Sequence, residues 1–501
     1  MTAALNRFAI WPTLAIASAL SLCAMPALAQ DTTSTATLSL EEALQLARDN
    51  NPAYLQQRND LGVAKWSVRS AYGALLPSAS AGAGFGYTAS GAPRFGSVEF
   101  ERQPENYSSS YSLGLNYRLS GATLLQPSVE RARAKATERR VVGTESQLVA
   151  QVTQQYLSTL QARAQVEQAI REVARTGEHV RLAEARFEVG AGTPLDVRRA
   201  EVQEGQAEVL LLQARNTLAT SKLLLGQLMG KPLDPDVSLT SDFAIFDPSW
   251  QTQELVEMAI EANPTLLAAR ATSNAASTNV TSAKSSYLPS LNFSVGLQGS
   301  VYQAGSIDPL LNQRLAQISG SFGSCLDQNT IRTGAGLAPI PCLDPATPGL
   351  EADLRRQLEE ANSGFPFDYT PQPLSASMSI SLPIFTGFSR KLQVEQAEAN
   401  AADARYQVRA EELRLNQAVS AEVLSLETAY QTVLLQEQVR QRAEEELRLA
   451  QERFRFGAAS SVEVTDAQTN LSQAERDKID ALYDFHKSLA ALEALVGQQL
   501  R

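Results

Sequence analysis

The side chains of this chain that could act together chemically are acids at the start of helical patterns. Glu463 and Asp466 are three residues apart where a helical pattern restarts, so their carboxylates share one helix face. Such a pair could attract cations. Acids in a first helical turn also stabilise the helix dipole, so a purely structural role stays open for each of them.

The remaining polar residues do not indicate enzymatic chemistry. The two histidines, His179 and His486, lie in long helical patterns, where we expect both to be exposed to solvent. The sequence has no Ser/His/Asp cluster, no glycine-rich phosphate loop and no metal-ligand spacing. We therefore expect a protein that is not an enzyme and that needs no cofactor and no metal.

Two similar turns carry the acids. Residues 453–468 repeat residues 186–201, and each copy has a glycine where a helical pattern stops, Gly190 or Gly457. Small or hydroxyl residues follow, and then an acid. Glycine just past a helix C-terminus, followed by Ser or Thr and an acid, is typical of a tight turn between two helices. One such turn alone indicates an ordinary helical hairpin.

The similarity extends over most of the chain. Asn51 and Asn263, each followed by proline, are 212 residues apart, whereas Gly190 and Gly457 are 267 apart, so the second copy carries an insertion of 55 residues. Self-similarity of this kind indicates repeated structural units. The sequence predicts a signal peptide at 1–29, one repeat at 30–250 and a second at 251–501, with the insertion at about 303–372.

The amino terminus and the composition limit the class of protein. Arg7, an apolar run at 8–22 and Ala-Leu-Ala at 27–29 are typical of a secretory signal peptide. The net charge of −11 argues against a nucleic-acid binder. In an exported chain, Cys325 and Cys342 are expected to form a disulfide within the insertion.

Three segments alternate between apolar and small polar residues, at 111–119, 291–298 and 374–382, and a fourth, glycine-rich segment at 78–88 is also expected to be a strand, with the weakest pattern of the four. This period fits a half-buried sheet or a strand that spans a membrane. Past the signal no apolar run reaches about 20 residues, so membrane insertion would need strands. Four strands cannot close a barrel and a bilayer tolerates no open sheet edge, so several chains must share one barrel. Three chains would give twelve strands. The insertion is expected to be a surface loop with one short helix at 350–361.

Long helices are expected to occupy most of the remaining chain. A seven-residue period runs from Val152 to Phe187 and again from Val419 to Phe454, as in coiled coils. The helix at 127–189 would be about 95 Å long, against about 54 Å and 36 Å for those at 194–229 and 52–76. We therefore expect each repeat to pair one continuous helix with one broken helix.

In this order, the motifs resemble the TolC family of outer-membrane channel proteins over nearly the whole chain. The resemblance rests on the repeated Asn-Pro, on Leu-Pro-Ser at 76–78 and 288–290, on Leu-Pro-Ile-Phe-Thr-Gly at 382–387 and on the two glycine turns. The first repeat departs at 115–121, where the family's Pro-Leu-Phe-x-Gly is eroded. The resemblance implies a mainly α fold with a small β part. Three chains would form a long α-helical coiled-coil barrel joined to a 12-stranded transmembrane β-barrel, in the cell outer membrane and reaching into the periplasm.

The resemblance also implies a function. It indicates the outer-membrane channel and periplasmic tunnel of a tripartite efflux pump or a type I secretion system, which passively conducts what an inner-membrane pump delivers. The implied partners are two further copies in a homotrimer, a periplasmic adaptor (membrane fusion) protein, an inner-membrane pump or ABC exporter, and outer-membrane lipid. A secreted structural coiled coil is the alternative, but it leaves the strands and the repeat unexplained. The sequence does not indicate the cargo.

Positions that match the family's motifs define the candidate site. Glu463 and Asp466 correspond to acids that ring the pore constriction, and crowding there would raise some of their pKa values. Asp196 corresponds to an acid that holds the closed tip, but Phe454 and Ala459 replace its usual Tyr and Arg partners. We expect Arg198, Arg199 and Arg453 to substitute for those partners. The segments matching the adaptor-docking turns are Val189, Gly190, Ala191 and Gly192, and Phe456, Gly457, Ala458 and Ala459.

Overall fold

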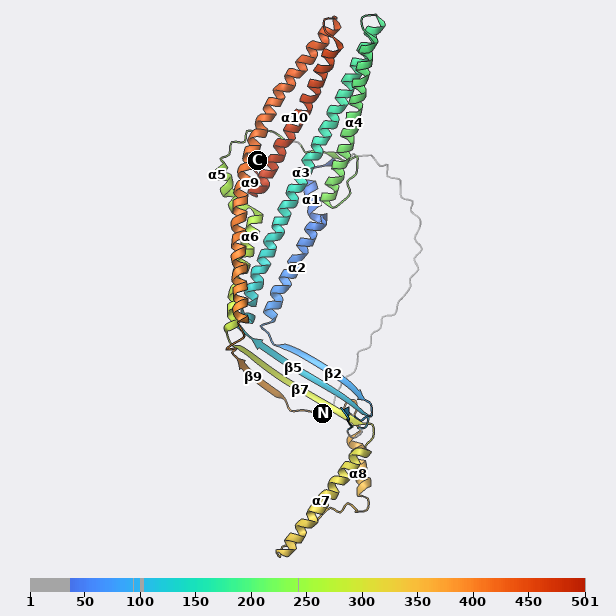
Figure 1. Cartoon of the computed structure of the whole chain (residues 1–501), viewed down its shortest axis with the longest axis vertical. Helices are drawn as coiled ribbons and strands as arrows, with labels where there is room; N and C mark the ends of the chain where they lie inside the picture. The colour runs from blue at the N-terminus through green and yellow to red at the C-terminus, as the bar shows by residue number, and fades with distance from the viewer. Residues whose placement is uncertain (1–36, 93, 100–102, 242, 501) are drawn as a thin grey trace, which may run out of the picture.

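The computed structural model describes residues 37–92, 94–99, 103–241 and 243–500. The signal peptide expected at 1–29 lies outside these residues. Figure 1 shows an elongated molecule with two helical hairpins at one end, a sheet beyond them and a helical arm at the other end. No helix among the described residues combines the length and the apolar character needed to cross a membrane.

Two long antiparallel hairpins form the helical part. The first pairs α3 (Gly121–Glu188) with α4 (Pro194–Met229), and the second pairs α9 (Ser389–Arg455) with α10 (Ser461–Val496). The 68 residues of α3 correspond to about 100 Å. This helix starts before Pro127, because the Ser120 hydroxyl accepts a hydrogen bond from the Thr123 amide at 3.1 Å.

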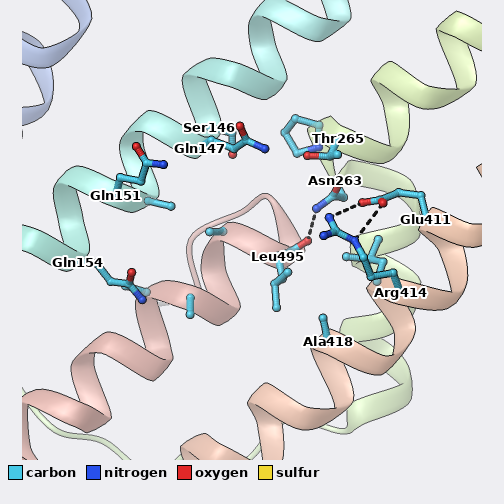
Figure 2. A pocket seen from close by; sticks show the side chains of 16 residues that line it. Ser146, Gln147, Gln151, Gln154, Asn263, Thr265, Glu411, Arg414, Ala418 and Leu495 are labelled. Carbon is cyan, nitrogen blue, oxygen red and sulfur yellow. Dashed lines mark hydrogen bonds and ion pairs between the residues drawn. The ribbon is translucent and has the colours of Figure 1, made fainter. Parts of the chain in front are cut away.

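Shorter helices continue the line of the return helices, as the sequence predicts. They are α1 (Leu40–Asn50), α2 (Pro52–Gly73), α5 (Thr252–Ala262) and α6 (Pro264–Lys284). Each Asn-Pro pair ends one helix and starts the next. The Asn51 side chain donates a hydrogen bond to the Leu228 carbonyl at 2.8 Å, and Asn263 donates to the Leu495 carbonyl at 2.9 Å. Figure 2 shows this second joint, beside a cavity of about 340 Å³.

The apolar core lies around these joints. Val152 and Tyr156 of α3 pack with Leu225 and Met229 of α4 in the first repeat, and Phe485 of α10 is the fully buried centre of the second. A short parallel pair, β1 (Thr37–Leu38) with β6 (Ser238–Leu239), adjoins the first cluster. The joints are therefore the most firmly packed part of the helical region, whereas the hairpin ends have thinner apolar seams.

The predicted seven-residue frame holds in the second hairpin but not to the end of the first. Val419, Leu426 and Phe454 are buried, whereas Phe187 is 47% exposed. Placing Phe187 in the seam was therefore wrong. A straight helix drifts by about 20° per heptad relative to a seven-residue repeat, so the frame moves off the seam over five repeats. Phe454 belongs to the apolar cluster within its own hairpin, and Arg186 of the other hairpin covers its ring in addition.

The four predicted strands form one antiparallel sheet in the order β2 (Ser78–Thr88), β5 (Asn106–Leu119), β7 (Ser290–Ala304) and β9 (Ser375–Ser381). β5 and β7 are longer than predicted. Leu113 pairs with Ala81 on one side and Leu297 on the other, so apolar side chains align on one face. The sheet is open, with β2 and β9 at its edges.

The insertion departs most from the prediction. In addition to the predicted α8 (Leu350–Ala361), it contains α7 (Asp308–Gly334), which the sequence did not predict. The Gly, Ser and Asn content of this stretch weakens the helix pattern. Contacts with the return segment stabilise it: the Asn329 side chain bonds both the amide and the carbonyl of Ile340, at 2.7 and 2.8 Å. Cys325 and Cys342 form a disulfide, with Cα atoms 5.8 Å apart.

The remaining short elements complete the fold. They are β3 (Arg94–Phe95), β4 (Val98–Glu99), the 3₁₀ turn η1 (Ser285–Tyr287) and β8 (Thr370–Pro371), which pairs with β7. Gly121, the first residue of α3, packs so tightly on this turn that a β-carbon would meet the Ser285 carbonyl oxygen at 2.7 Å. This contact fixes the angle at which the chain leaves the sheet.

Candidate functional site: the hairpin tips

The first tip is a glycine turn closed by side chains of its own hairpin. Gly190 has φ +73°, a left-handed conformation that glycine adopts without strain. Thr193 and Asp196 form a capping box at the start of α4. From the end of α3, Arg186 donates a hydrogen bond to the Ala191 carbonyl at 3.0 Å. The turn is therefore held from both sides.

The second tip repeats this construction with one addition. Gly457 also has φ +73°, and Ser460 and Glu463 form the capping box of α10. Arg453 donates a hydrogen bond to the Ala458 carbonyl at 3.1 Å and also forms an ion pair with Glu463 at 3.1 Å. Glu463 is therefore engaged within its own tip, and Arg453 contacts residues of the same tip.

Two side chains, Ser461 and Arg186, join the tips to each other, and sequence reasoning missed both. Ser461 donates a hydrogen bond from its hydroxyl to Asp196 at 2.7 Å. Arg186 donates to the Phe454 carbonyl and lays its guanidinium over the Phe454 ring, 4.3 Å from the ring centre. Arg186 is the repeat equivalent of Arg453, so the repeated motif contained a signal for it. Ser461 is an ordinary residue of a first helical turn and gave none.

The local charges follow these contacts. The hydrogen bond from Ser461, and after it those from Thr193, hold the pKa of Asp196 below its usual value. Asp196 is thus an anion held by Ser461 and Thr193 at neutral pH. Arg199 lies on the same helix and lowers this pKa further, but more weakly.

The expectation that both histidines are solvent-exposed is wrong. His179 lies between α3 and the second hairpin, 5% exposed, with its ring 5.9 Å from that of Phe454. Its burial lowers the pKa, and the charge of Asp196 only partly opposes this effect. His486 is also buried, beside Phe243 and Phe485. Both lie where helices of different hairpins or segments meet, which a seven-residue frame along one helix does not indicate.

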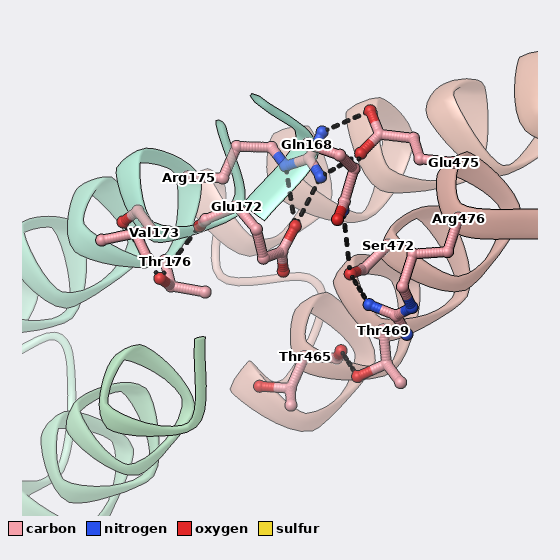
Figure 3. Close-up of polar contacts among 10 residues, drawn as sticks. All are labelled: Gln168, Glu172, Val173, Arg175, Thr176, Thr465, Thr469, Ser472, Glu475 and Arg476. Carbon is pink, nitrogen blue, oxygen red and sulfur yellow. Dashed lines mark hydrogen bonds and ion pairs between the residues drawn. The ribbon is translucent and has the colours of Figure 1, made fainter. Parts of the chain in front are cut away.

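A partly buried charged cluster joins the hairpins further down, about 20 Å from the end of α3. Arg175 donates hydrogen bonds to Glu172 at 3.1 Å and, from α3 across to α10, to Glu475 at 2.8 and 2.6 Å (Figure 3). Gln168 donates to Glu475 at 3.2 Å and to Ser472 at 3.3 Å. Burial raises the pKa of Glu475, but the bonds from Arg175 and Gln168 outweigh it and the pKa lies below its usual range.

The other predicted site residues lie at the surface of the tips. Glu463 and Asp466 are exposed on α10, and Arg198 forms an ion pair with Glu201 at 2.7 Å rather than with Asp196. Val189 and Phe456 are 78% and 89% exposed. Among the described residues, no three His, Cys, Asp or Glu side chains gather to hold a metal ion. The tips thus offer exposed apolar side chains, small residues and acids, an arrangement suited to binding a partner or an ion.

The comparisons with known proteins fit this geometry. The sequence pattern of a family described as outer membrane efflux protein matches residues 43–231 and 348–498. The chain belongs to this family. Family membership makes it an outer-membrane efflux channel protein that extends into the periplasm, and the family is one of transport proteins rather than enzymes. The secreted structural coiled coil is not favoured. Helix α7 lies between the two matched parts.

Relatives of known identity cover most of the chain. Outer membrane protein TolC of Vibrio cholerae is 23% identical over 472 residues, which is 92% of this chain and 90% of that protein. Outer membrane efflux protein BepC of Brucella suis is 24% identical over 389 residues, 74% of this chain and 72% of the relative. The TolC relationship rests on nearly complete coverage of both proteins.

Solved structures show the same fold. The outer membrane protein VceC of Vibrio cholerae superposes with a TM-score of 0.65 at 17% identity, covering 92% of this chain and 97% of that one. The CmeC outer membrane channel of Campylobacter jejuni gives 0.67 at 15% identity, with 98% and 95% covered. The resemblance seen in the sequence is thereby confirmed, including the mainly helical fold with its small sheet.

Proposed function

We propose that three copies of this chain close into one conduit, with a 12-stranded barrel in the outer membrane and a helical tunnel in the periplasm. The observation that carries this proposal is the open sheet whose four main strands share one apolar face, with β2 and β9 at its edges. A bilayer tolerates no unpaired edge, so each edge needs a partner from another copy.

Two measurements test this assembly together. The purified protein should run as a heat-dissociable trimer on gels, and it should conduct ions in planar bilayers. A folded protein that stays monomeric in outer-membrane detergent extracts and never conducts would contradict the proposal. In the proposed trimer, the two repeats of each chain, at 30–250 and 251–501, each contribute two strands and one hairpin to the conduit.

We further propose roles for the tips. Glu463 and Asp466 form an acidic ring at the periplasmic constriction, where threefold symmetry would bring six carboxylates together. The exposed turns at 189–192 and 456–459 dock a periplasmic adaptor protein, because Gly and Ala allow close approach of a partner backbone. The adaptor would connect the conduit to an inner-membrane pump or ABC exporter, for efflux or for type I secretion.

The closed state would depend on Asp196. Its hydrogen bond from Ser461 joins the two hairpins of one chain, which supports a holding role for this acid. Arg198, Arg199 and Arg453 are exposed, and we propose that they add contacts between neighbouring copies when the tips gather. A closed conduit should then conduct poorly, and breaking the Asp196 contact should raise the conductance.

A further inference from the structure

The segment between α8 and β8, residues 362–369, folds back onto the sheet. We call it the aromatic loop, because it carries Phe365, Phe367 and Tyr369. Its beginning is fixed by Asn362, whose side chain bonds both the amide and the carbonyl of Ala304 at 2.7 Å. Its end continues into β8, which pairs with β7. The loop is thus tied to the sheet at both ends.

The contacts of the aromatic loop show which face it covers. Tyr369 and Ser109 share a hydrogen bond of 2.9 Å between their hydroxyls, and the Tyr369 ring lies 4.9 Å from that of Tyr111. Phe365 lies 5.7 Å from Tyr107. The three partners of the aromatic loop, Tyr107, Ser109 and Tyr111, are alternate residues of β5, and alternate residues of a strand share one face. All of these contacts are therefore on a single face of the sheet.

That face is the apolar one. Further along β5 the same alternate positions are Leu113, Leu115 and Leu119, which pair with Leu297, Val295 and Leu291 of β7. The opposite positions of β5 carry Ser, Gly, Asn and Arg. In a membrane barrel the apolar face contacts lipid and the polar face lines the lumen. The aromatic loop accordingly lies on the lipid side of the sheet, not over the channel mouth.

The loop also marks the end of the apolar face. Ser109 interrupts the apolar row, yet it is 1% exposed because Tyr369 covers it and satisfies its hydroxyl. Beside it Phe367, Phe85 and Tyr87 stay 71%, 63% and 59% exposed. Phe85 and Tyr87 belong to the last four residues of β2, and that end of β2 points away from the long helices (Figure 1). Rings exposed at the end of an apolar band suit the boundary between acyl chains and headgroups.

We propose that the aromatic loop is a membrane anchor that binds the outer-leaflet boundary of acyl chains and headgroups. It turns part of the insertion outward over the bilayer and sets how deeply the sheet sits in the membrane. The inference rests on the proposed conduit, in which this sheet is part of the membrane wall.

Fluorescence quenching by lipid tests the anchor. Phe367→Trp places a probe on the loop, and Ile331→Trp places a matched probe on α7, where Ile331 is 72% exposed and the helix is beyond the sheet. Both trimers are reconstituted in bilayers whose lipids carry bromine near the headgroup end of the acyl chains. The signal of Trp66 and Trp250, measured in the parent protein, is subtracted. We expect the bromolipid to quench the fluorescence of the Phe367→Trp probe. The fluorescence of the Ile331→Trp probe should be quenched by aqueous acrylamide and not by the bromolipid.

Each outcome is decisive. Acrylamide quenching at both positions, in a trimer that conducts ions, would overturn the anchor and leave the proposed conduit intact. Equal bromolipid quenching at both positions would also overturn it, because the aromatic loop would then contact lipid no more than α7 does. Loss of the trimer and of conductance in the parent protein would remove the conduit and the anchor together. A Tyr369→Phe variant, which removes only the hydroxyl bonded to Ser109, should shift Phe367→Trp emission to longer wavelength.

Discussion

Replacing Arg175 should separate the two hairpins of one chain. Its guanidinium lies between Glu172 and Glu475, whose side chains are only 10% and 13% exposed. Arg175→Met would leave two carboxylates close together without a cation. Breaking a fully buried ion pair costs about 3–5 kcal/mol. Because the Arg175 side chain is itself 25% exposed, we expect a loss of about 2–3 kcal/mol in the free energy of unfolding.

The pH dependence gives the sharper test. In the parent protein the pKa of Glu475 is depressed, so its contribution is present above the unfolded pKa, about 4.3, and is lost as pH falls through the folded pKa. In Arg175→Met, Glu172 and Glu475 repel each other when both are charged, so the variant should be least stable at neutral pH. Its deficit relative to the parent should shrink as pH falls from 7 towards 4. The assay is urea unfolding of the detergent-solubilised protein, followed by helical circular dichroism.

A matched control is present on the second hairpin. Arg448 bonds Glu445 and Glu452, but all three side chains are about half exposed. Arg448→Met should cause no resolvable change, because exposed ion pairs contribute little. A triple variant that removes all three charges should recover most of the lost stability. It combines Arg175→Met with Glu172→Gln and Glu475→Gln. Equal effects of Arg175→Met and Arg448→Met, or a deficit that does not depend on pH, would refute the reasoning.

Three further predictions concern the tips. Replacing Glu463 and Asp466 with Ala should weaken block of the channel by divalent cations, measured in planar bilayers; unchanged block would remove the acidic ring. Cysteines at Val189 and Phe456, which are highly exposed, should crosslink a periplasmic adaptor in whole cells, and failure to trap any periplasmic partner would count against docking. Gly190→Ala should cost about 1–2 kcal/mol through its left-handed backbone alone, since no atom lies where the β-carbon would be, and thermal unfolding would show it.

The sequence predicted what depends on local pattern. The strand at 78–88 and the helix at 350–361 have the predicted bounds in the structure. Each has a residue at its border that marks where it begins, Pro77 before the strand and Gly349 before the helix. The joints at Asn51 and Asn263 were equally readable, because an Asn-Pro pair both ends and starts a helix.

Helix α7 was not predictable in the same way. Its glycines and serines give weak local propensity. The segment that follows α7 stabilises it, through the Asn329–Ile340 hydrogen bonds and through the disulfide between Cys325 of the helix and Cys342. The burial of His179 was missed for a related reason, since the residues that cover it belong to a hairpin that begins more than 200 residues later. A pattern along one helix reports contact with its nearest neighbour, and not with a third helix.

At the tips, equivalent residues of the two repeats make different contacts, so the repeat does not predict them. Arg186 and Arg453 are equivalent, and both hold their own turn through a carbonyl five residues on. Arg186 then reaches the other hairpin through Phe454, whereas Arg453 turns back to Glu463. Of these two equivalent arginines, Arg186 therefore joins the hairpins and Arg453 stabilises its own tip.

The same asymmetry separates the roles of the acids. Asp196 accepts a hydrogen bond from Ser461 of the opposite hairpin. Its repeat equivalent, Glu463, contacts Arg453 and the capping residue Ser460, both of its own tip. An acid tied to the opposite hairpin reports on how the hairpins are placed. An acid tied to its own turn is free to keep its position when the hairpins move. We therefore propose that Asp196 holds the closed state, and that Glu463, with Asp466 one turn further, lines the constriction in either state.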